Sequence, residues 1–100
     1  MSEILLIEDD DSQREALEEF LRDSLGKKVN SASSISEALT LFQKKTPEII
    51  VSDLMLPDGT GIDFIKEVRK SDETIPILIL TAQPSIETAV EAIHSGASDI

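Results

Sequence analysis

Acidic and hydroxyl side chains follow three of the four strands that this sequence predicts, at the point where each strand ends. The acidic run 8–11 follows the first strand, Asp53 follows the third and Thr81 follows the fourth. Clustered carboxylates repel one another unless a cation neutralises them, and an all-oxygen site suits a hard cation such as Mg²⁺. Because a carboxylate oxygen beside such a cation can attack phosphorus, the predicted chemistry is phosphoryl transfer.

Each of these residues also has a purely structural interpretation. Acidic side chains at 8–11 would complement the partial positive charge of a helix N-terminus, and Thr81 would be an ordinary hydroxyl at a strand end. Asp53 is harder to explain in this way, because an isolated carboxylate at the end of an apolar strand is costly to bury. The functional interpretation therefore depends mainly on Asp53.

The apolar pattern predicts an alternating fold around these residues. Short apolar runs predict strands at 4–7, 29–32, 49–51 and 77–80, of which the second is partly polar and the fourth the most apolar. Helical spacing follows each run and predicts helices that begin at Ser12 and Ser34 with capping boxes, near Ile62, and at Pro84 and Ser85. This order favours an α/β doubly wound parallel sheet, in which ligands bind at the carboxyl ends of the strands.

Further details concern turns and the core. Gly26 and Gly96 are predicted to end helices, and Pro57, Gly59 and Gly61 to form a loop after Asp53. The three phenylalanines are predicted to lie in the core: Phe20, Phe42 and Phe64.

The composition narrows the classes of site and partner. The chain has 100 residues, with 20 Asp and Glu against 9 Lys and Arg, and a net charge of −11. Such a surface disfavours nucleic acids and anionic membranes, whose phosphates attract basic patches. The absence of Cys and the single His exclude disulfides, thiolate zinc sites and a His-cluster metal site within one chain. Because no targeting signal and no apolar run of roughly 18 residues is visible, we expect one cytoplasmic domain over residues 1–100.

In combination, four segments resemble the receiver domains of bacterial two-component response regulators. The resemblance spans the whole chain, and the segments have the family's order and spacing: residues 4–10 (ILLIEDD), 51–61 (VSDLMLPDGTG), 77–82 (ILILTA) and 96–99 (GASD). It implies the flavodoxin-like receiver topology, with strand order 2-1-3-4-5. The segment 85–92 (SIETAVEA) is further similar to receivers attached to transcriptional activators.

The resemblance implies a role for each matching position. Asp53 matches the residue that takes a phosphoryl group from a sensor histidine kinase or a phosphotransfer protein. Thr81 matches the switch hydroxyl that moves toward this phosphoryl group, and Ala82 is the small residue that leaves room for it. The implied Mg²⁺ ligands are three carboxylates and one backbone carbonyl oxygen, those of Glu8, Asp9, Asp53 and Met55.

The sequence departs from the family near its C-terminal end. Family members carry a Lys at the end of the fifth strand, beyond Ile100, and Ile100 itself stands where the family usually has Tyr or Phe. We therefore expect a receiver domain over residues 1–100 that lacks most of the fifth strand and the last helix. It would be a fragment of a longer protein or be completed by a second chain. A homodimer or a strand exchange would suit such an exposed sheet edge.

The resemblance implies a signalling switch, which assists its own phosphorylation and dephosphorylation but is not an enzyme. Phosphorylation of Asp53 would move Thr81 and change the face of the fourth helix, where an output domain or partner protein binds. The alternative is a receiver-like interaction module that does not turn over phosphate. Enzyme alternatives are disfavoured, because a flavodoxin-like cofactor site needs a Ser/Thr-rich loop at 8–11. A haloacid-dehalogenase-type phosphatase needs Asp-x-Asp, where this chain has Met55 two residues after Asp53.

Overall fold

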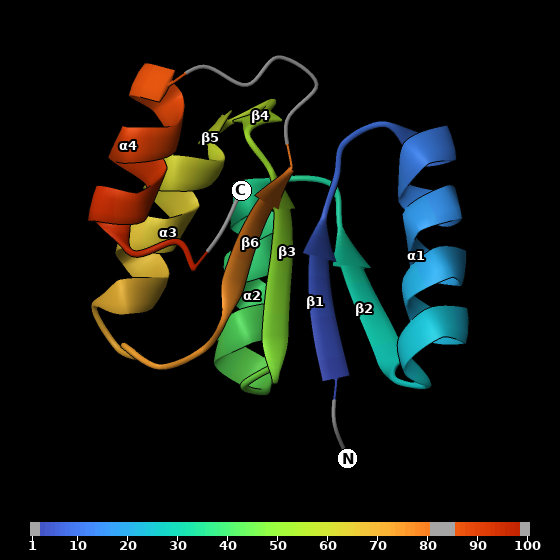
Figure 1. Cartoon of the computed structure of the whole chain (residues 1–100). Helices are drawn as coiled ribbons and strands as arrows, with labels where there is room; N and C mark the ends of the chain where they lie inside the picture. The colour runs from blue at the N-terminus through green and yellow to red at the C-terminus, as the bar shows by residue number, and fades with distance from the viewer. Residues whose placement is uncertain (1–2, 81–85, 99–100) are drawn as a thin grey trace.

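The structure, a computed structural model, describes residues 3–80 and 86–98. Its main sheet has parallel strands in the order β2-β1-β3-β6 (Figure 1). These strands are β1 (Glu3–Ile7), β2 (Lys28–Ala32), β3 (Ile49–Asp53) and β6 (Ile77–Leu80). The α/β class, the parallel sheet and the relative order of the four predicted strands are thereby confirmed. The expected beginning of a fifth strand at residues 99–100 lies outside the described residues.

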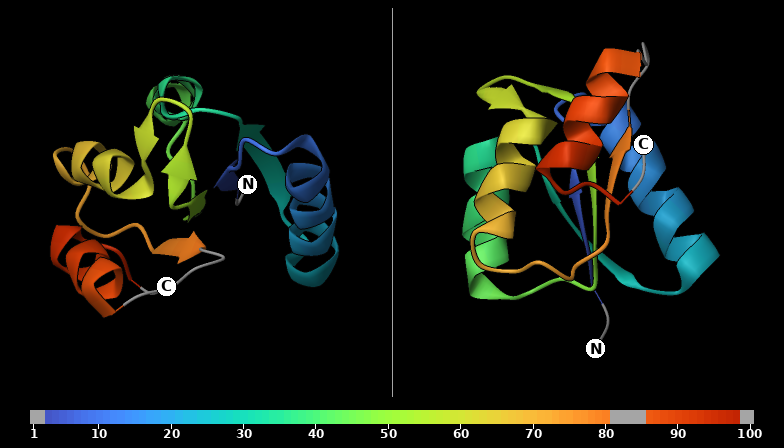
Figure 2. Two further views of the ribbon diagram at one scale, coloured as in Figure 1. Left: turned by 90° about the horizontal axis from the view of Figure 1, so that it is seen from above. Right: turned by 60° about the vertical axis from the view of Figure 1, so that its left-hand side comes forward.

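Helices alternate with these strands over the described part of the chain: α1 (Asp11–Leu25), α2 (Ile35–Lys44), α3 (Gly61–Arg69) and α4 (Ile86–Ser95). Helix α1 lies on one face of the sheet, α2 and α3 lie on the other, and α4 packs beside α3 (Figures 1 and 2). The central strand β1 supplies both faces, with Ile4 and Leu6 packed toward α1 and with Leu5 and Ile7 in the larger core on the other side. Within residues 3–80 and 86–98, no helix combines the length and the apolar character that crossing a membrane requires.

The first helix begins earlier than the sequence predicts. Its N-cap is Asp10, whose carboxylate accepts a hydrogen bond from the backbone N–H of Gln13 at 2.9 Å. The predicted start at Ser12, with a capping box to Glu15, is wrong because Asp10 supplies a cap two residues upstream. The predicted end at Gly26 is confirmed, since Gly26 adopts a left-handed φ of 64° there.

The N-cap of α2 confirms a prediction, whereas the N-cap of α3 was not predicted. Ser34 caps α2 as predicted, and its hydroxyl accepts the backbone N–H of Glu37 at 3.2 Å. The predicted capping box is not completed, because the Glu37 carboxylate accepts the hydroxyl of Ser33 and not the backbone N–H of Ser34. A reciprocal capping box lies at the start of α3, where Thr60 and Asp63 each accept the other's backbone N–H. The capping-box motif usually has Glu or Gln at the third helical position, where this helix has Asp63.

The segment after β3, predicted as a loop, contains a short antiparallel pair. Strand β4 (Met55–Leu56) pairs with β5 (Gly59–Thr60), and Gly61 is already the first residue of α3. The chain therefore passes from the carboxyl end of β3 through this hairpin directly into a helix (Figure 1).

The phenylalanines differ in burial. Phe64 is fully buried, and Phe42 is partly buried against the core, as predicted, but Phe20 is 64% exposed. The predicted core position of Phe20 is wrong because α1 contacts the sheet along a narrow stripe that contains Leu17 and Leu21. Phe20 lies outside this stripe, on the solvent side of the helix.

Strand β6 is buried on one face only, although it was predicted as the most apolar strand. Ile77 and Ile79 are fully buried, whereas Leu78 and Leu80 are 37% and 38% exposed. The apolar cluster beneath α1 draws its described members from α1, β1, β2 and β3, so the outer face of β6 has no cover from that helix.

Candidate functional site

Three carboxylates meet at the carboxyl edge of the sheet. Glu8 and Asp9 directly follow β1, and Asp53 is the last residue of the neighbouring strand β3. One carboxylate oxygen of each lies within 4.8 Å of the others. Adjacent parallel strands end at the same edge of a sheet, which explains why residues 44 positions apart converge (Figure 1: β1 and β3 lie side by side). The predicted proximity of these three residues is confirmed.

The backbone of Glu8 is held on both sides. Its N–H donates to the carbonyl oxygen of Ala32 at 3.0 Å, and its carbonyl oxygen accepts from Nη1 of Arg14 at 3.1 Å. The Glu8 carboxylate accepts the backbone N–H of Asp10 at 3.2 Å. With a side chain only 4% exposed, Glu8 forms the buried floor of the cluster.

Asp53 is half-buried, so part of this residue is exposed to solvent at the edge of the sheet. Its Oδ1 accepts the backbone N–H of Leu54 at 2.7 Å, and this N–H also points to the carbonyl oxygen of Leu80 at 3.0 Å. The Asp53 carbonyl oxygen accepts the hydroxyl of the fully buried Ser52 at 2.9 Å. These contacts fix the direction in which the end of β3 presents the Asp53 carboxylate.

Gly61 allows α3 to begin directly against Asp53. A Cβ at this position would lie 2.6 Å from the carbonyl oxygen of Asp53, which is closer than any real contact. The N–H of Gly61 donates to the carbonyl oxygen of Leu54 at 2.7 Å. The sequence marked Gly61 as a loop glycine, whereas its function here is this close approach of backbone to backbone.

The electrostatics of the cluster are unfavourable without a cation. The pKa of Glu8 is raised from an ordinary 4.5 to about 7. Burial is the main cause, the neighbouring carboxylates of Asp53 and Asp9 act in the same direction, and the hydrogen bond from Asp10 opposes them. The donor set contains only carboxylate oxygens, which hard divalent cations prefer. The residues present therefore fit a metal ion of that class, and a bound cation would relieve their mutual repulsion.

Other predicted site residues are less completely placed. Met55 lies in β4, two residues after Asp53, with a side chain that is 65% exposed. Thr81 and Ala82, predicted to bind the phosphoryl group, lie outside the described residues.

Asp58 supports the site in a way that the sequence analysis missed. Its carboxylate accepts the backbone N–H groups of Ile35 at 2.9 Å and Ser36 at 3.0 Å, and these hydrogen bonds lower the pKa of Asp58. Asp58 thereby joins the hairpin that follows Asp53 to the N-terminus of α2. Only contact in the folded protein could reveal this link, because 23 residues separate the donor from the acceptor.

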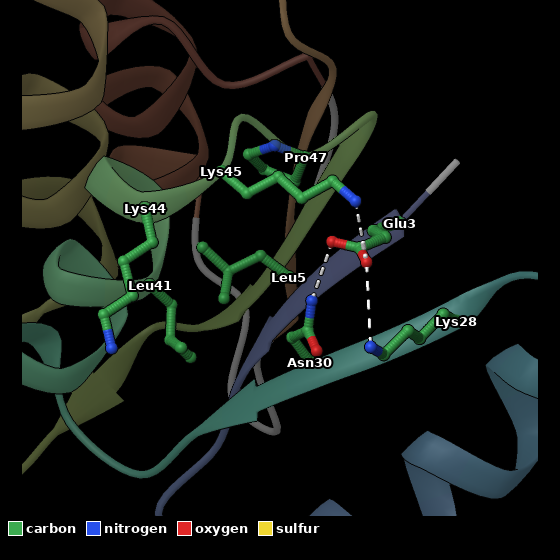
Figure 3. Close-up of a pocket in the computed structure, with 8 residues that line it drawn as sticks. All are labelled: Glu3, Leu5, Lys28, Asn30, Leu41, Lys44, Lys45 and Pro47. Carbon is green, nitrogen blue, oxygen red and sulfur yellow. Dashed lines mark hydrogen bonds and ion pairs between the residues drawn. The ribbon is translucent and has the colours of Figure 1, made fainter. Parts of the chain in front are cut away.

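The opposite end of the sheet has a different character. Between α2 and the amino ends of β1 and β2 lies a cavity of about 310 Å³, partly lined by Lys28, Lys44 and Lys45 (Figure 3). Inside it, the carboxylate of Glu3 accepts from Lys45 at 3.1 Å and from the side-chain amide of Asn30 at 2.9 Å. This carboxylate is surrounded by cations, whereas the carboxylates at the other end are surrounded by one another.

Comparison with known proteins agrees with this fold and site. The model of the response regulator receiver domain family matches residues 4–100. The chain therefore belongs to the receiver-domain family of two-component response regulators, which are signalling modules and not classical enzymes. The acidic cluster of Glu8, Asp9 and Asp53 fits a phosphoacceptor site of that family.

Curated relatives include transcriptional regulators. The chain is 39% identical over 99 residues to the transcriptional regulatory protein AfsQ1 of Streptomyces coelicolor, covering 99% of this chain and 43% of that protein. It is 37% identical over 99 residues to the virulence transcriptional regulatory protein PhoP of Salmonella typhimurium, covering 99% of this chain and 44% of that protein. The chain thus spans less than half the length of these relatives.

Solved structures are also similar to this chain over nearly its whole length. The chemotaxis protein CheY4 of Vibrio cholerae is similar with a TM-score of 0.93 and 35% identity, over 99% of this chain and 83% of that chain. The non-phosphorylated HemR receiver domain of Leptospira biflexa is similar with a TM-score of 0.90 and 35% identity, over 99% of this chain and 79% of that chain.

Proposed function

We propose that this receiver domain accepts a phosphoryl group on Asp53 in a Mg²⁺-dependent reaction. The donor is a phosphohistidine of a sensor kinase or of a phosphotransfer protein. The observation that carries the proposal is the convergence of Glu8, Asp9 and Asp53 within 4.8 Å at the edge of the sheet, where Asp53 is only half-buried. In this proposal these three carboxylates hold the cation, together with the backbone carbonyl oxygen of Met55.

The chemical step is a displacement at phosphorus. An oxygen of the Asp53 carboxylate forms the new P–O bond, the P–N bond of the donor breaks, and its electron pair returns to the imidazole nitrogen. The product is an acyl phosphate, and no group is oxidised or reduced. A bound Mg²⁺ supplies charge neutralisation between the carboxylates and the phosphoryl oxygens. Glu8 and Asp9 would hold the cation, and the hydrogen bond that the backbone N–H of Leu54 donates to Oδ1 of Asp53 orients the attacking carboxylate.

The switch itself is proposed on sequence resemblance. The Thr81 hydroxyl donates to a phosphoryl oxygen, and Ala82 leaves space for that group. Movement of Thr81 then changes the surface of α4 that an output domain or partner protein reads. With a net charge of −11, the domain acts through protein contacts and does not itself bind nucleic acid.

Intact-mass measurement tests the proposal. The chain is incubated with Mg²⁺ and a small acyl phosphate donor, in parallel with Asp53→Asn and the matched control Asp23→Asn. Asp23 lies on α1 with a side chain that is 69% exposed. We expect one phosphoryl adduct on the wild type and on Asp23→Asn, none on Asp53→Asn, and none when a chelator removes Mg²⁺.

The opposite result is equally informative. A folded wild type that binds Mg²⁺ but gains no adduct from the acyl phosphate or from a phosphorylated kinase would overturn the proposal. The receiver-like interaction module would then be the better description. An adduct that persists in Asp53→Asn would place the acceptor at another residue.

A further inference from the structure

Arg14 differs from the other arginine of its helix in what it contacts. It lies in the first turns of α1, and its side chain is only 20% exposed, whereas that of Arg22 is 59% exposed. Arg22 approaches only Asp23, at 3.9 Å, among the ion pairs of the described residues. Arg14 instead directs its guanidinium back toward the loop between β1 and α1.

The guanidinium of Arg14 bridges this loop. Its Nη1 donates to the carbonyl oxygen of Glu8 at 3.1 Å, and its Nη2 donates to Oδ1 of Asp11 at 2.5 Å. The backbone N–H of Arg14 donates to the carbonyl oxygen of Asp10 at 2.8 Å. One residue thus makes three contacts to the acidic segment 8–11, of which the backbone contact is an ordinary first-turn hydrogen bond of α1 and the two guanidinium contacts are specific to the arginine side chain. A guanidinium suits this geometry, because it presents several donors in a rigid plane and remains charged.

The carbonyl that Arg14 holds belongs to the peptide that joins Glu8 to Asp9. This peptide is flanked by ψ of Glu8 and φ of Asp9, and changes in these torsions that do not compensate each other would alter the direction of the Asp9 carboxylate relative to that of Glu8. On the other side of Glu8, its N–H is tied to the carbonyl oxygen of Ala32 in β2. Loss of the contact with Arg14 would leave this loop held from the β2 side and by the cap at Asp10.

The charge of Arg14 is balanced outside the cluster. Its guanidinium donates to the Asp11 carboxylate, which raises the pKa of Arg14, and Glu18 and Glu37 act in the same direction. Arg14 therefore contacts the Glu8 backbone without forming an ion pair with the Glu8 carboxylate. The carboxylates of Glu8 and Asp9 remain available to a metal ion.

We infer that Arg14 is a positioning residue for the metal site, because its guanidinium fixes the Glu8–Asp9 peptide so that both carboxylates face Asp53. This inference rests on the proposed function, since it concerns the same Mg²⁺ site. It predicts that Arg14→Ala weakens Mg²⁺ binding by roughly tenfold or more, as loss of partners that orient metal ligands usually does. Phosphorylation of Arg14→Ala would be slow at low Mg²⁺ and approach the wild-type rate when Mg²⁺ saturates the site.

Simple electrostatics predicts the opposite sign. Removing a positive charge beside an acidic cluster raises its attraction for a cation, so Arg14→Ala would bind Mg²⁺ more tightly if charge alone mattered. The direction of the change therefore separates positioning from charge. Arg14→Lys keeps the charge but replaces the planar fork by one flexible ammonium, and we expect its Mg²⁺ affinity to lie between those of the wild type and Arg14→Ala.

Mg²⁺ titration followed by backbone amide NMR tests the inference, because the chain contains no Trp or Tyr for fluorescence. The dissociation constant is measured for the wild type, Arg14→Ala, Arg14→Lys and the matched control Arg22→Ala, with the melting temperature of each. Weaker binding by Arg14→Ala, with wild-type affinity in Arg22→Ala, supports the positioning role. Arg14→Lys carries the same test if Arg14→Ala does not fold.

Unchanged or tighter Mg²⁺ binding in Arg14→Ala overturns the inference, as does an equal loss in Arg22→Ala. Failure of the proposed function is distinguishable, because the wild type itself would then bind no Mg²⁺ or form no adduct in the mass measurement. A wild type that does both, beside an Arg14→Ala variant of equal affinity, would refute only the role of Arg14.

Discussion

Strand β1 connects two buried glutamates whose surroundings are opposite. Glu3 begins the strand and is 6% exposed, and Glu8 directly follows it and is 4% exposed. The Lys45 ammonium donates to the Glu3 carboxylate and holds the pKa of Glu3 below its ordinary value. Lys28 and Asn30 act in the same direction, and burial opposes them. Burial and neighbouring carboxylates instead raise the pKa of Glu8 to about 7.

In our proposal, this difference separates a structural carboxylate from one that binds a metal ion. A buried charge must be paired within the protein or coordinate a metal ion. Glu3 finds its partners within the chain, at 3.1 Å from Lys45 and 3.9 Å from Lys28 (Figure 3). The side chains that Glu8 faces are the carboxylates of Asp9 and Asp53. In our proposal, an external cation completes the cluster at the carboxyl edge, and without a cation the repulsion between these carboxylates is unfavourable for the folded protein.

Exchanging each carboxylate for an amide gives the largest expected contrast. Glu8→Gln should weaken Mg²⁺ binding by at least roughly 10–100-fold, the range found when only an outer partner of a metal ligand is lost. Its melting temperature at pH 8 without metal should not fall, because the amide removes an unfavourable charge. Glu3→Gln should bind Mg²⁺ normally but melt several degrees lower, since Lys45 loses its partner.

Calorimetric Mg²⁺ titration and thermal melting of both variants check this contrast. A comparable loss of Mg²⁺ affinity in Glu3→Gln would contradict the separation of the two ends of β1. A markedly lower melting temperature of metal-free Glu8→Gln at pH 8 would show that Glu8 is a structural carboxylate after all.

The next largest expected effect is the pH dependence of Mg²⁺ binding. Mg²⁺ must displace the proton of Glu8, so with a pKa of about 7 the dissociation constant should rise by roughly 30-fold between pH 8 and pH 5.5. Between pH 4.5 and about 7, the folded metal-free protein holds a proton on Glu8 that the unfolded chain has lost. The contribution of Glu8 to stability therefore decreases as pH rises through this window.

Glu3 should behave in the opposite way. Its pKa is lowered in the folded state, so its contribution is present above the ordinary pKa of a glutamate and is lost as pH falls through the folded value. Mg²⁺ titrations at several pH values compare the wild type with Glu8→Gln, in which this steep dependence should be reduced. A wild-type affinity that is independent of pH from 5.5 to 8 would contradict the raised pKa of Glu8.

The smallest expected effect is on the melting temperature, when each of the adjacent lysines 44 and 45 is replaced in turn. Lys45→Met removes the nearest cation from Glu3 and should lower the melting temperature by a few degrees, less at high salt, because Lys45 is 52% exposed and its ion pair is screened. Lys44→Met changes the neighbouring residue, whose side chain has no ion pair or hydrogen bond in the described structure. It should leave stability within about 0.5 kcal/mol. Neither variant should alter Mg²⁺ binding, and equal melting temperatures for both would contradict the role given to Lys45.

Local sequence patterns predicted the residues of the cluster well. Glu8, Asp9 and Asp53 each follow a short apolar run, and the parallel arrangement of these runs follows from their alternation with helices. Where two local signals competed, the prediction was less accurate. Ser12 and Asp10 are both good caps, and only the backbone of the folded loop selects Asp10. Phe20 matches the helical period, yet α1 contacts the sheet along a narrower stripe.

Contacts between distant segments could not be predicted in this way. Asp58 caps α2 from a hairpin 23 residues away, and Gly61 is required by the carbonyl oxygen of Asp53. Arg14 holds the carbonyl of Glu8, and Glu3 meets Lys45 from another element. Each of these residues has an ordinary local interpretation as a loop acid, a loop glycine or a surface charge. Their roles depend on which segments the fold brings together.

The order of the elements and the edge of the sheet at which carboxylates gather follow from the sequence, because apolar periodicity and chain order are local properties. The tertiary structure alone decided which buried glutamate is neutralised and which is left facing other acids. Desolvation and Coulomb energy depend on the distance between side chains and on their depth below the surface. Two glutamates at the ends of one strand therefore acquire opposite pKa shifts and, in our proposal, different functions.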